Sequence, residues 1–314
     1  MNTVPHTELS LGDNKVPHTV FLHEVAARDG LQNESVILTT AQKVELLGLL
    51  AAARPNSLEV TSFVRADAIP QLADAEEVCA AIRHAPWRRG LPLVGLVMNE
   101  RGYARFRAAG LDAITAVVGA NEDFSLANSG MSVARAVAVN RELCAAARAD
   151  GVPVRMYLSL AFGSPRQETS AAAVLALVET FAVEGVERIL LADTVGVGRP
   201  EATSALVDAA LKIVPAQRLG LHMHDTYGRA LENCAAAADL GVRHFDASAG
   251  GTGGCPFAPG AAGNLATGAL LAWARARDLA PETDPVATDR AARFLAGLLG
   301  RSLALGDERR PAQP

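Results

Sequence analysis

The stretch that decides the fold covers residues 219–264 and reads, in succession, LGLHMHDTYG, RALENCAAAADL, GVRHFDAS and AGGTGGCPFAPGAAGN. Its first and third parts contain short apolar runs, which are typical of buried strands, and its second part is an Ala- and Leu-rich run typical of a helix. The fourth part is rich in glycine and indicates a loop. The stretch therefore predicts one strand–helix–strand unit of an α/β protein, followed by a long loop.

The same alternation recurs along the whole chain. Apolar, often β-branched runs are followed by longer stretches of helical period, which favours βα units and a parallel sheet. We expect strands at residues 20–26, 58–64, 91–98, 113–118, 154–161, 188–192, 219–224 and 244–247. Eight such units in roughly 260 residues predict an α/β fold of the (β/α)₈ TIM-barrel type.

A doubly wound open sheet is the alternative fold. Its dinucleotide-binding form carries Gly-x-Gly-x-x-Gly after the first strand, whereas residues 28–34 read RDGLQNE here. We therefore prefer the barrel and expect it, with the catalytic residues, at 19–280. A flexible N-terminal tail is expected at 1–18, and a C-terminal helical extension and tail at 281–314, with the helix from Thr288 to Leu303.

Composition excludes several classes of protein. The 314 residues include 34 acidic and 29 basic side chains, for a net charge of −5. The sequence contains no block of basic residues of the kind that binds nucleic acid. No apolar run reaches the roughly 18 residues of a membrane span, and the polar start lacks the apolar core of a signal peptide. The cysteines match neither zinc nor disulfide spacing, which favours reduced thiols and a cytoplasmic location; they are Cys79, Cys144, Cys234 and Cys255.

Polar residues gather where the expected strands end, which is where barrel enzymes carry their chemistry. They are Arg28 and Asp29 after the first strand, Glu59, Thr61 and Ser62 on the second, Asn99 after the third, Asp193 and Thr194 after the sixth, His222, His224 and Asp225 on the seventh, and Cys255 and Asn264 after the eighth. Each also has an ordinary structural interpretation. A local salt bridge, a satisfied core carboxylate, a helix cap or a small apolar filler would account for Arg28–Asp29, Glu59, Asp193–Thr194 and Cys255 respectively.

The two histidines carry the sharpest signal. Residues two apart in a strand share a face, so His222 and His224 point the same way and can hold a metal ion from one side. Two His, one Asp and one Asn would form a nitrogen and oxygen set without a thiolate. Such a set favours Mg²⁺ or Mn²⁺ over structural zinc.

Taken together, the motifs resemble those of the 3-hydroxy-3-methylglutaryl-CoA lyase family, within the wider group of metal-dependent barrel lyases and Claisen-type synthases. The resemblance covers nearly the whole barrel. It rests on RDGLQNE at 28–34, EVTSF at 59–63, DTVG at 193–196, HMHDTYG at 222–228, GGCP at 253–256 and GNLAT at 263–267.

The resemblance implies a role for each site residue. The divalent cation would be held by Asp29, His222, His224 and Asn264, and Arg28 would stabilise the enolate oxygen formed on the thioester. Cys255 would act as the general acid on a mobile loop, with Glu59 and Asp193 beside the metal, and His222 or Asp193 would take the hydroxyl proton. The small-molecule substrate would be an acyl-CoA, 3-hydroxy-3-methylglutaryl-CoA, cleaved to acetyl-CoA and acetoacetate.

Three positions depart from the family pattern. Ala27 replaces a proline, Thr252 replaces a leucine, and Gly268 replaces an acidic residue. The last two motivate an alternative in which the same lyase chemistry acts on a different 3-hydroxy-3-alkylglutaryl-CoA, so that leucine degradation or another branched-chain route would follow.

Two further alternatives concern the reaction class and the partners. A Claisen-type synthase joining acetyl-CoA to a 2-oxo acid is disfavoured by the Cys255 loop and by the short C-terminal region. A non-catalytic metal or acyl-CoA binding protein is disfavoured by the complete set of site residues. The Ala-rich helices are compatible with a homodimer, although no stretch specifies its interface.

Overall fold

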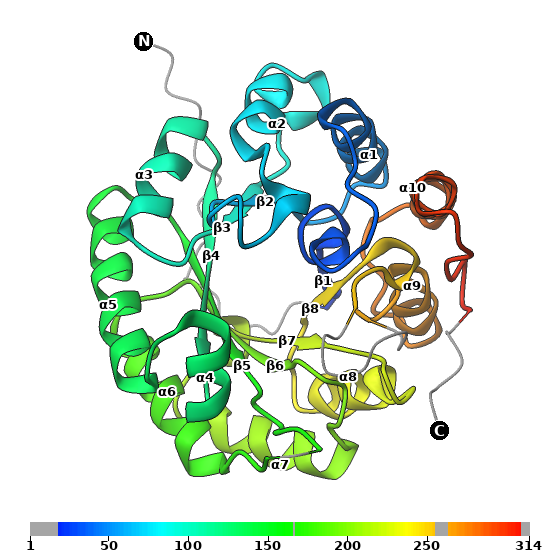
Figure 1. Ribbon diagram of the computed structural model, residues 1–314. Helices are drawn as coiled ribbons and strands as arrows, with labels where there is room; N and C mark the ends of the chain where they lie inside the picture. Colours follow the sequence, from blue (N-terminus) through cyan, green and yellow to red (C-terminus); the bar gives the residue numbers. More distant parts are fainter. Residues whose placement is uncertain (1–17, 166, 255–262, 309–314) are drawn as a thin grey trace.

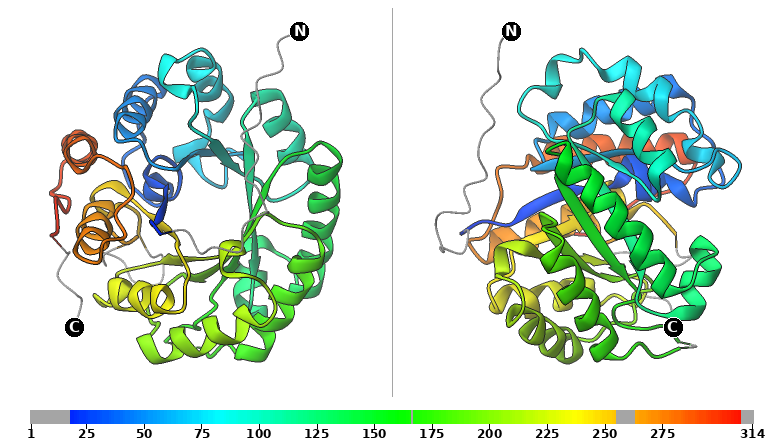
Figure 2. Two further views of the ribbon diagram at one scale, coloured as in Figure 1. Left: turned by 180° about the vertical axis from the view of Figure 1, so that it is seen from behind. Right: turned by 90° about the vertical axis from the view of Figure 1, so that its left-hand side faces the viewer.

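Eight parallel strands close into a barrel in chain order, with β1 paired to β8. The computed structural model describes residues 18–165, 167–254 and 263–308. The strands are β1 (Phe21–Glu24), β2 (Ser57–Ser62), β3 (Leu93–Leu96), β4 (Ala113–Gly119), β5 (Val154–Ser159), β6 (Arg188–Asp193), β7 (Leu219–Met223) and β8 (His244–Ala247). This closure confirms the predicted TIM barrel and excludes the open sheet. Figure 1 looks onto the C-terminal ends of the strands, and the left view of Figure 2 looks onto the opposite end.

Helices surround the barrel on its outside (Figure 1). They are α1 (Thr40–Ala52), α2 (Ala75–Ile82), α3 (Glu100–Ala109), α4 (Glu122–Ser129), α5 (Val133–Ala149), α6 (Ala171–Val183), α7 (Pro200–Leu211), α8 (Ala230–Asp239), α9 (Thr267–Ala276) and α10 (Pro285–Leu299). Because helices cover one face of the sheet and side chains fill the other, the strands are buried almost throughout.

Two helices differ from the sequence expectation. An additional short helix, α4, follows β4; the Asn121 side chain accepts the Phe124 N–H at its start, and Gly130 adopts a left-handed conformation at its end. The C-terminal helix α10 begins and ends earlier than expected. The Asp284 carboxylate accepts two N–H groups at its start and Gly300 ends it in a left-handed conformation.

The turn after β1 places the first candidate residues at the mouth of the barrel. Residues Ala26–Gly30 form one π-helical turn, a geometry that often occurs at functional sites. Ala27, where the family carries proline, is buried in this turn. Glycine fits at position 30, because a Cβ atom there would lie 2.5 Å from Thr252 Oγ1 and would force a neighbouring group to shift. The turn and the start of the glycine-rich loop are therefore in direct contact.

Glu24 joins three elements behind this turn. Its Oε1 accepts the N–H groups of Ala26 (2.9 Å) and Ala249 (3.0 Å), and its Oε2 accepts the Thr267 hydroxyl (2.7 Å). Burial raises the pKa of Glu24 from 4.5 to about 7, although these hydrogen bonds act in the opposite direction. The carboxyl group therefore keeps its proton in the folded state at a pH where the unfolded chain has lost it.

We expect this group to make stability fall as pH rises. Between pH 4.5 and about 7 the unfolded state releases a proton that the folded state retains, which costs on the order of 3 kcal/mol by pH 8. Glu24→Gln keeps the shape without the titration, so its free energy of unfolding should fall less than that of the parent protein between pH 5 and pH 8. Urea unfolding at the two pH values measures this, and an equal fall in both proteins would contradict it.

Candidate active site and metal centre

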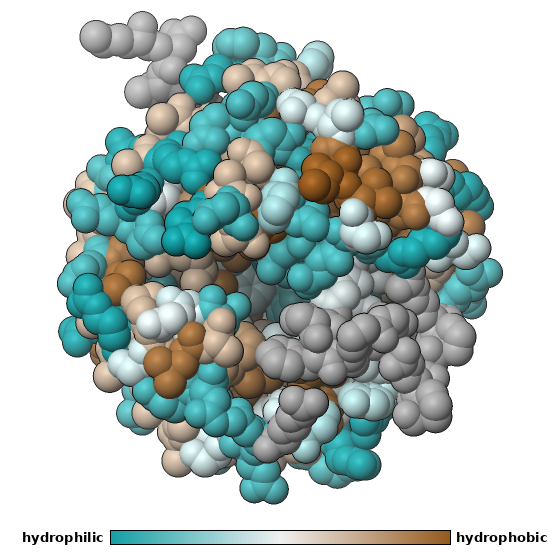
Figure 3. All heavy atoms as spheres, viewed as in Figure 1, coloured by the Kyte–Doolittle hydropathy of each residue, from teal (hydrophilic) through white to brown (hydrophobic). Residues whose placement is uncertain are grey.

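A cavity of about 550 Å³ opens at the C-terminal ends of the strands. Its lining includes Arg28, Asp29, Tyr157, His222 and His224. Figure 3 shows the same face hollowed near its centre. The cavity therefore lies where the barrel fold places catalytic groups.

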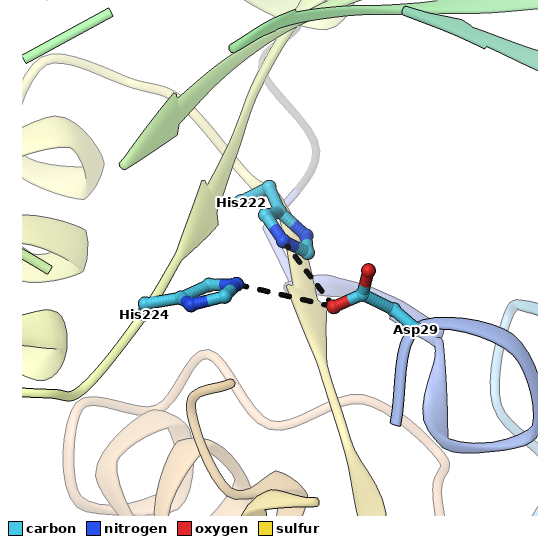
Figure 4. A group of neighbouring side chains, drawn as sticks. All are labelled: Asp29, His222 and His224. Atoms are coloured by element: carbon cyan, nitrogen blue, oxygen red, sulfur yellow. Dashed lines mark ion pairs between the residues drawn. The ribbon is translucent and has the colours of Figure 1, made fainter. Parts of the chain in front are cut away.

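Three of the four expected metal ligands meet in this cavity. The Nε2 atoms of His222 and His224 each lie 3.9 Å from Oδ2 of Asp29, and the candidate ligand atoms of the three residues lie within 4.8 Å of one another. Figure 4 shows both rings directed at the same carboxylate. Met223, between the histidines, is buried in the apolar core, as the alternation of a strand requires.

Asn264 is placed beside this cluster by backbone pairing. It forms an isolated bridge with His224, flanked by hydrogen bonds from Asp225 N–H to Gly263 O (2.8 Å) and from Leu265 N–H to Met223 O (3.0 Å). The carboxamide Nδ2 of Asn264 donates to Oδ2 of Asp29 at 2.7 Å and to the Thr252 carbonyl at 3.0 Å. The fourth expected ligand therefore contacts the carboxylate that the other two approach.

Arg28 is held firmly at the edge of the cavity. Its Nε and Nη2 both lie 2.7 Å from Oε2 of Glu59, and its Nη1 donates to Oδ1 of Asp29 at 2.5 Å. Glu59 is fully buried and is absent from the cavity lining, so it contacts the site through Arg28. Burial by itself would raise the pKa of Asp29, but the charge of Arg28 and the two histidines hold it well below its usual range. Asp29 is thus an ionised carboxylate aimed at two imidazoles.

A carboxylate that the sequence reasoning missed orients His222. Asp246 on β8 has its Oδ2 3.2 Å from Nδ1 of His222, and this oxygen also accepts the Tyr157 hydroxyl. Its Oδ1 accepts from Nη2 of Arg155 at 2.8 Å. His222 and Asp246 are register partners on neighbouring strands, so the expected strand order could have indicated the pair. By engaging Nδ1, Asp246 leaves Nε2 of His222 facing Asp29.

The structure does not bring Asp193 into this cluster. Its two carboxylate oxygens accept the N–H groups of Val197 (3.0 Å) and Gly198 (2.8 Å), and the residue does not line the cavity. Burial raises the pKa of Asp193 to about 6. Its neighbour Thr194 does line the cavity, and the Thr194 hydroxyl accepts the Leu160 N–H at 2.9 Å.

Other expected positions have local structural roles. Asn99 caps α3 through the Gly102 N–H, and Asp225 accepts the Ala230 N–H at 2.9 Å. Cys79, Cys144 and Cys234 are buried free thiols, and burial raises the pKa of each. Cys255, the expected general acid, lies outside the described residues.

The two departures near the loop have structural explanations. Thr252 is fully buried; its hydroxyl lies 2.5 Å from Ser248 Oγ, and its carbonyl accepts from Asn264. Thr252 therefore anchors both the loop and a candidate ligand. At Gly268, a Cβ atom would collide with the carbonyl oxygen of Gly306. The C-terminal segment occupies the space that an acidic side chain would need.

Residues 19–295 match the HMGL-like family. The chain belongs to that family. This result confirms the resemblance expected from the motifs and the interpretation of the protein as an enzyme of the lyase type.

Related proteins of known name are similar to this chain over most of its length. The cytoplasmic 3-hydroxy-3-methylglutaryl-CoA lyase of Mus musculus is 37% identical over 82% of this chain and 74% of its own length. The HMG-CoA lyase of Brucella melitensis is 38% identical and superposes with a TM-score of 0.87 over 90% of this chain and 99% of that one. An HMG-CoA lyase from Acenitobacter baumannii, solved with coenzyme A and 3-methylmalate, is 32% identical, with a TM-score of 0.86 over 94% of this chain and 98% of that one. Among the described residues, no helix combines the length and apolarity of a membrane span.

Proposed function

We propose that this HMGL-like protein is a divalent-metal-dependent carbon–carbon lyase that cleaves 3-hydroxy-3-methylglutaryl-CoA to acetyl-CoA and acetoacetate. The observation that carries the proposal is the convergence of Asp29, His222, His224 and Arg28 on one cavity. The names of the relatives agree with it, and the related lyase solved with coenzyme A supports an acyl-CoA as the ligand.

The residues present fit a divalent cation. Asp29 is ionised, two imidazole Nε2 atoms face it, and the Asn264 amide lies beside it. Nitrogen and oxygen donors without a thiolate suit Mg²⁺ or Mn²⁺, and we propose one of these as the cofactor. When bound, such a cation would polarise the substrate oxygens and lower the pKa of the tertiary hydroxyl.

Arg28 supplies a fixed positive charge to the same cavity. Two of its nitrogens are held by Glu59 and a third by Asp29, so the guanidinium is oriented before substrate arrives. Breaking the carbon–carbon bond leaves negative charge on the thioester oxygen of the departing acetyl-CoA. A preorganised cation at this position stabilises that charge.

Two proton transfers complete the proposed reaction. For removal of the hydroxyl proton, His222 and Asp193 both stay candidates. His222 lines the cavity, but its Nε2 faces the proposed cation and its Nδ1 faces Asp246, whereas both Asp193 oxygens accept backbone N–H groups. Cys255 then protonates the carbanion carbon. Its assignment rests on the family motif and on its predecessor Gly254, which lines the cavity and whose carbonyl accepts from Asn33 Nδ2 at 3.0 Å.

We expect acetyl-CoA release from 3-hydroxy-3-methylglutaryl-CoA to require Mg²⁺ or Mn²⁺, to stop in EDTA and to return when the cation is restored. A coupled assay for acetyl-CoA measures each state. Undiminished release from protein shown to be metal-free would contradict the proposed cofactor. A comparison with longer 3-hydroxy-3-alkylglutaryl-CoA compounds tests the alternative acyl group that Gly268 and Thr252 motivate, and a clear preference for the methyl compound would exclude it.

We expect Asp246→Asn to weaken Mn²⁺ binding by about 10- to 100-fold, because the amide no longer fixes the ring of His222 as a carboxylate does. Tyr157→Phe is the matched control, since it removes one contact to Asp246 but leaves His222 paired; its effect should be much smaller. Calorimetric titration with Mn²⁺ well below the unfolding midpoint gives both affinities. Parent-like affinity in Asp246→Asn would remove the assigned role.

The homodimer and the cytoplasmic location stay predictions. Relatives of this chain include proteins named as cytoplasmic and as mitochondrial, so the names of relatives do not choose between the two. The leucine-degradation pathway likewise depends on the acyl group that the turnover assay identifies.

A further inference from the structure

A second cavity, of about 760 Å³, lies at the opposite end of the barrel, where the strands begin. The left view of Figure 2 faces this end. Basic side chains and an aromatic ring share its lining, among them Phe21, His23, Arg155, Arg188 and His244. None of these residues belongs to the candidate metal cluster.

Several polar atoms here are buried and lack a partner. Arg155 binds Asp246 through Nη2, and Arg188 binds Gln217 O through Nη1 (2.8 Å) and Glu187 through Nη2 (3.1 Å). The Nε atoms of both arginines have no hydrogen-bond partner within the described part of the chain. Arg155 and Arg188 are each only 7% exposed. Since buried donors are almost always paired, two such atoms beside one cavity indicate a missing acceptor.

His23 repeats the pattern. Its Nδ1 lies 2.7 Å from Ser57 Oγ, whereas its Nε2 is buried and, among residues 18–165, 167–254 and 263–308, finds no hydrogen-bond partner. Its ring is only 2% exposed. A neutral imidazole can donate through that nitrogen.

The electrostatics of the cavity favour an anion. Arg155 and Arg188 are register partners on β5 and β6, so two guanidinium groups start from adjacent positions. Burial, and then the charge of Arg155, lower the pKa of Arg188 to about 10. Burial, and then the charges of Arg188 and Arg155, hold the pKa of His244 well below its usual value. Positive charge therefore accumulates here in spite of local acids.

The acids are already engaged. Glu187 pairs with Arg188, and Asp112 lies 3.7 Å from Arg88. Asp246 takes Arg155 but does not line the cavity, because it faces His222. Their engagement leaves the Nε atoms of Arg155 and Arg188 for another acceptor.

We propose that this cavity binds a small organic anion through a carboxylate or phosphate group, which accepts from Arg155, Arg188 and His23. Guanidinium groups recognise such oxyanions through paired N–H donors. The Phe21 ring, which stacks on His244 with 4.6 Å between ring centroids, offers an apolar wall to the body of the ligand. The proposal does not depend on the proposed lyase reaction, although Arg155 also binds Asp246, the carboxylate that orients His222.

Binding is tested on the full-length, metal-free protein by calorimetric titration. Inorganic phosphate and succinate are the two probes, each exchanged for chloride at constant ionic strength. Arg188→Gln is the main variant, because Arg155 also supports Asp246 at the active site. His23→Gln is the second variant, because Nε2 of His23 is one of the proposed donors, and unfolding midpoints establish that each protein is folded. Arg218→Gln is the matched control, since Arg218 binds the carbonyls of Ala182 and Val186 and does not line the cavity.

We expect one saturable site for at least one probe, weakened about tenfold or more in Arg188→Gln and in His23→Gln but unchanged in Arg218→Gln. The tighter probe identifies the anionic group. The proposal is overturned if neither probe saturates a site, if both cavity variants bind like the parent protein, or if Arg218→Gln loses as much affinity as they do. A selenate-soaked crystal with anomalous density between Arg155 and Arg188 would support it independently.

Discussion

Asp29→Asn is expected to weaken Mn²⁺ binding by at least about 100-fold and to abolish metal-dependent turnover. Asp29 is the only carboxylate in the cluster, and its two oxygens meet His222, His224, Asn264 and Arg28 at 2.5–3.9 Å. The asparagine has nearly the same shape but no charge to offset that of a divalent cation. The loss is therefore electrostatic, and it exceeds the 10- to 100-fold effects usual for residues that only support a ligand.

Calorimetric titration with Mn²⁺, together with the acetyl-CoA assay, measures the effect. Asp208→Asn serves as the control, because Asp208 is an exposed acid on α7 that pairs with Lys212. The Mn²⁺ affinity of this variant should equal that of the parent protein. Bound cation should also raise the unfolding midpoint of the parent protein but not that of Asp29→Asn. Tight Mn²⁺ binding by folded Asp29→Asn would show that the cation sits elsewhere.

Arg28→Lys is expected to lower kcat by about 10²- to 10³-fold, with a much smaller change in KM. Lysine keeps the positive charge, but it cannot reproduce the fork that meets Glu59 with two nitrogens and Asp29 with a third. The charge is then no longer held where the enolate oxygen develops. Because that negative charge exists only late in the reaction, the loss should appear in the rate rather than in substrate binding.

A structurally matched arginine controls for general effects of the substitution. Arg105 binds both oxygens of Glu76 on the outside of the barrel, through Nε at 2.5 Å and Nη2 at 2.9 Å. Arg105→Lys should leave kcat unchanged, and steady-state kinetics on both variants gives the comparison. Should Arg28→Lys turn over at the parent rate, the enolate charge would be stabilised by another group.

Local patterns in the sequence located most of the barrel. The expected strand at 244–247 matches β8, and the expected strand at 113–118 falls within β4. These features depend on residues only a few positions apart. The α4 helix was not predicted, because it spans only eight residues and its hydrophobic pattern is weak.

Some features of the candidate site likewise follow from local sequence, and others depend on how the barrel closes. His222 and His224 share a face because alternation in a strand is a local property, and the sequence therefore determined that pair. Closure of the barrel determined which side chains lie beside these two histidines. Asp29 and Asn264 are 235 positions apart, and Arg28 and Glu59 are 31 apart. Asp246 supports His222 only because β7 and β8 pair in that register, and Asp193 is turned to its own loop by two backbone N–H groups.

The physical reason is the sequence separation between the residues that interact. Backbone geometry repeats every two or three to four residues, so a sequence carries the direction of each side chain relative to its own strand or helix. Which strands become neighbours, and at what register, is settled by the packing of the whole barrel. For this protein the sequence alone determined the eight-unit pattern, the paired histidines and the family motifs. The tertiary structure alone decided that Asp246 orients His222 and that Arg155 and Arg188 lie side by side at the far end of the barrel. Both arrangements depend on which strands become neighbours when the barrel closes.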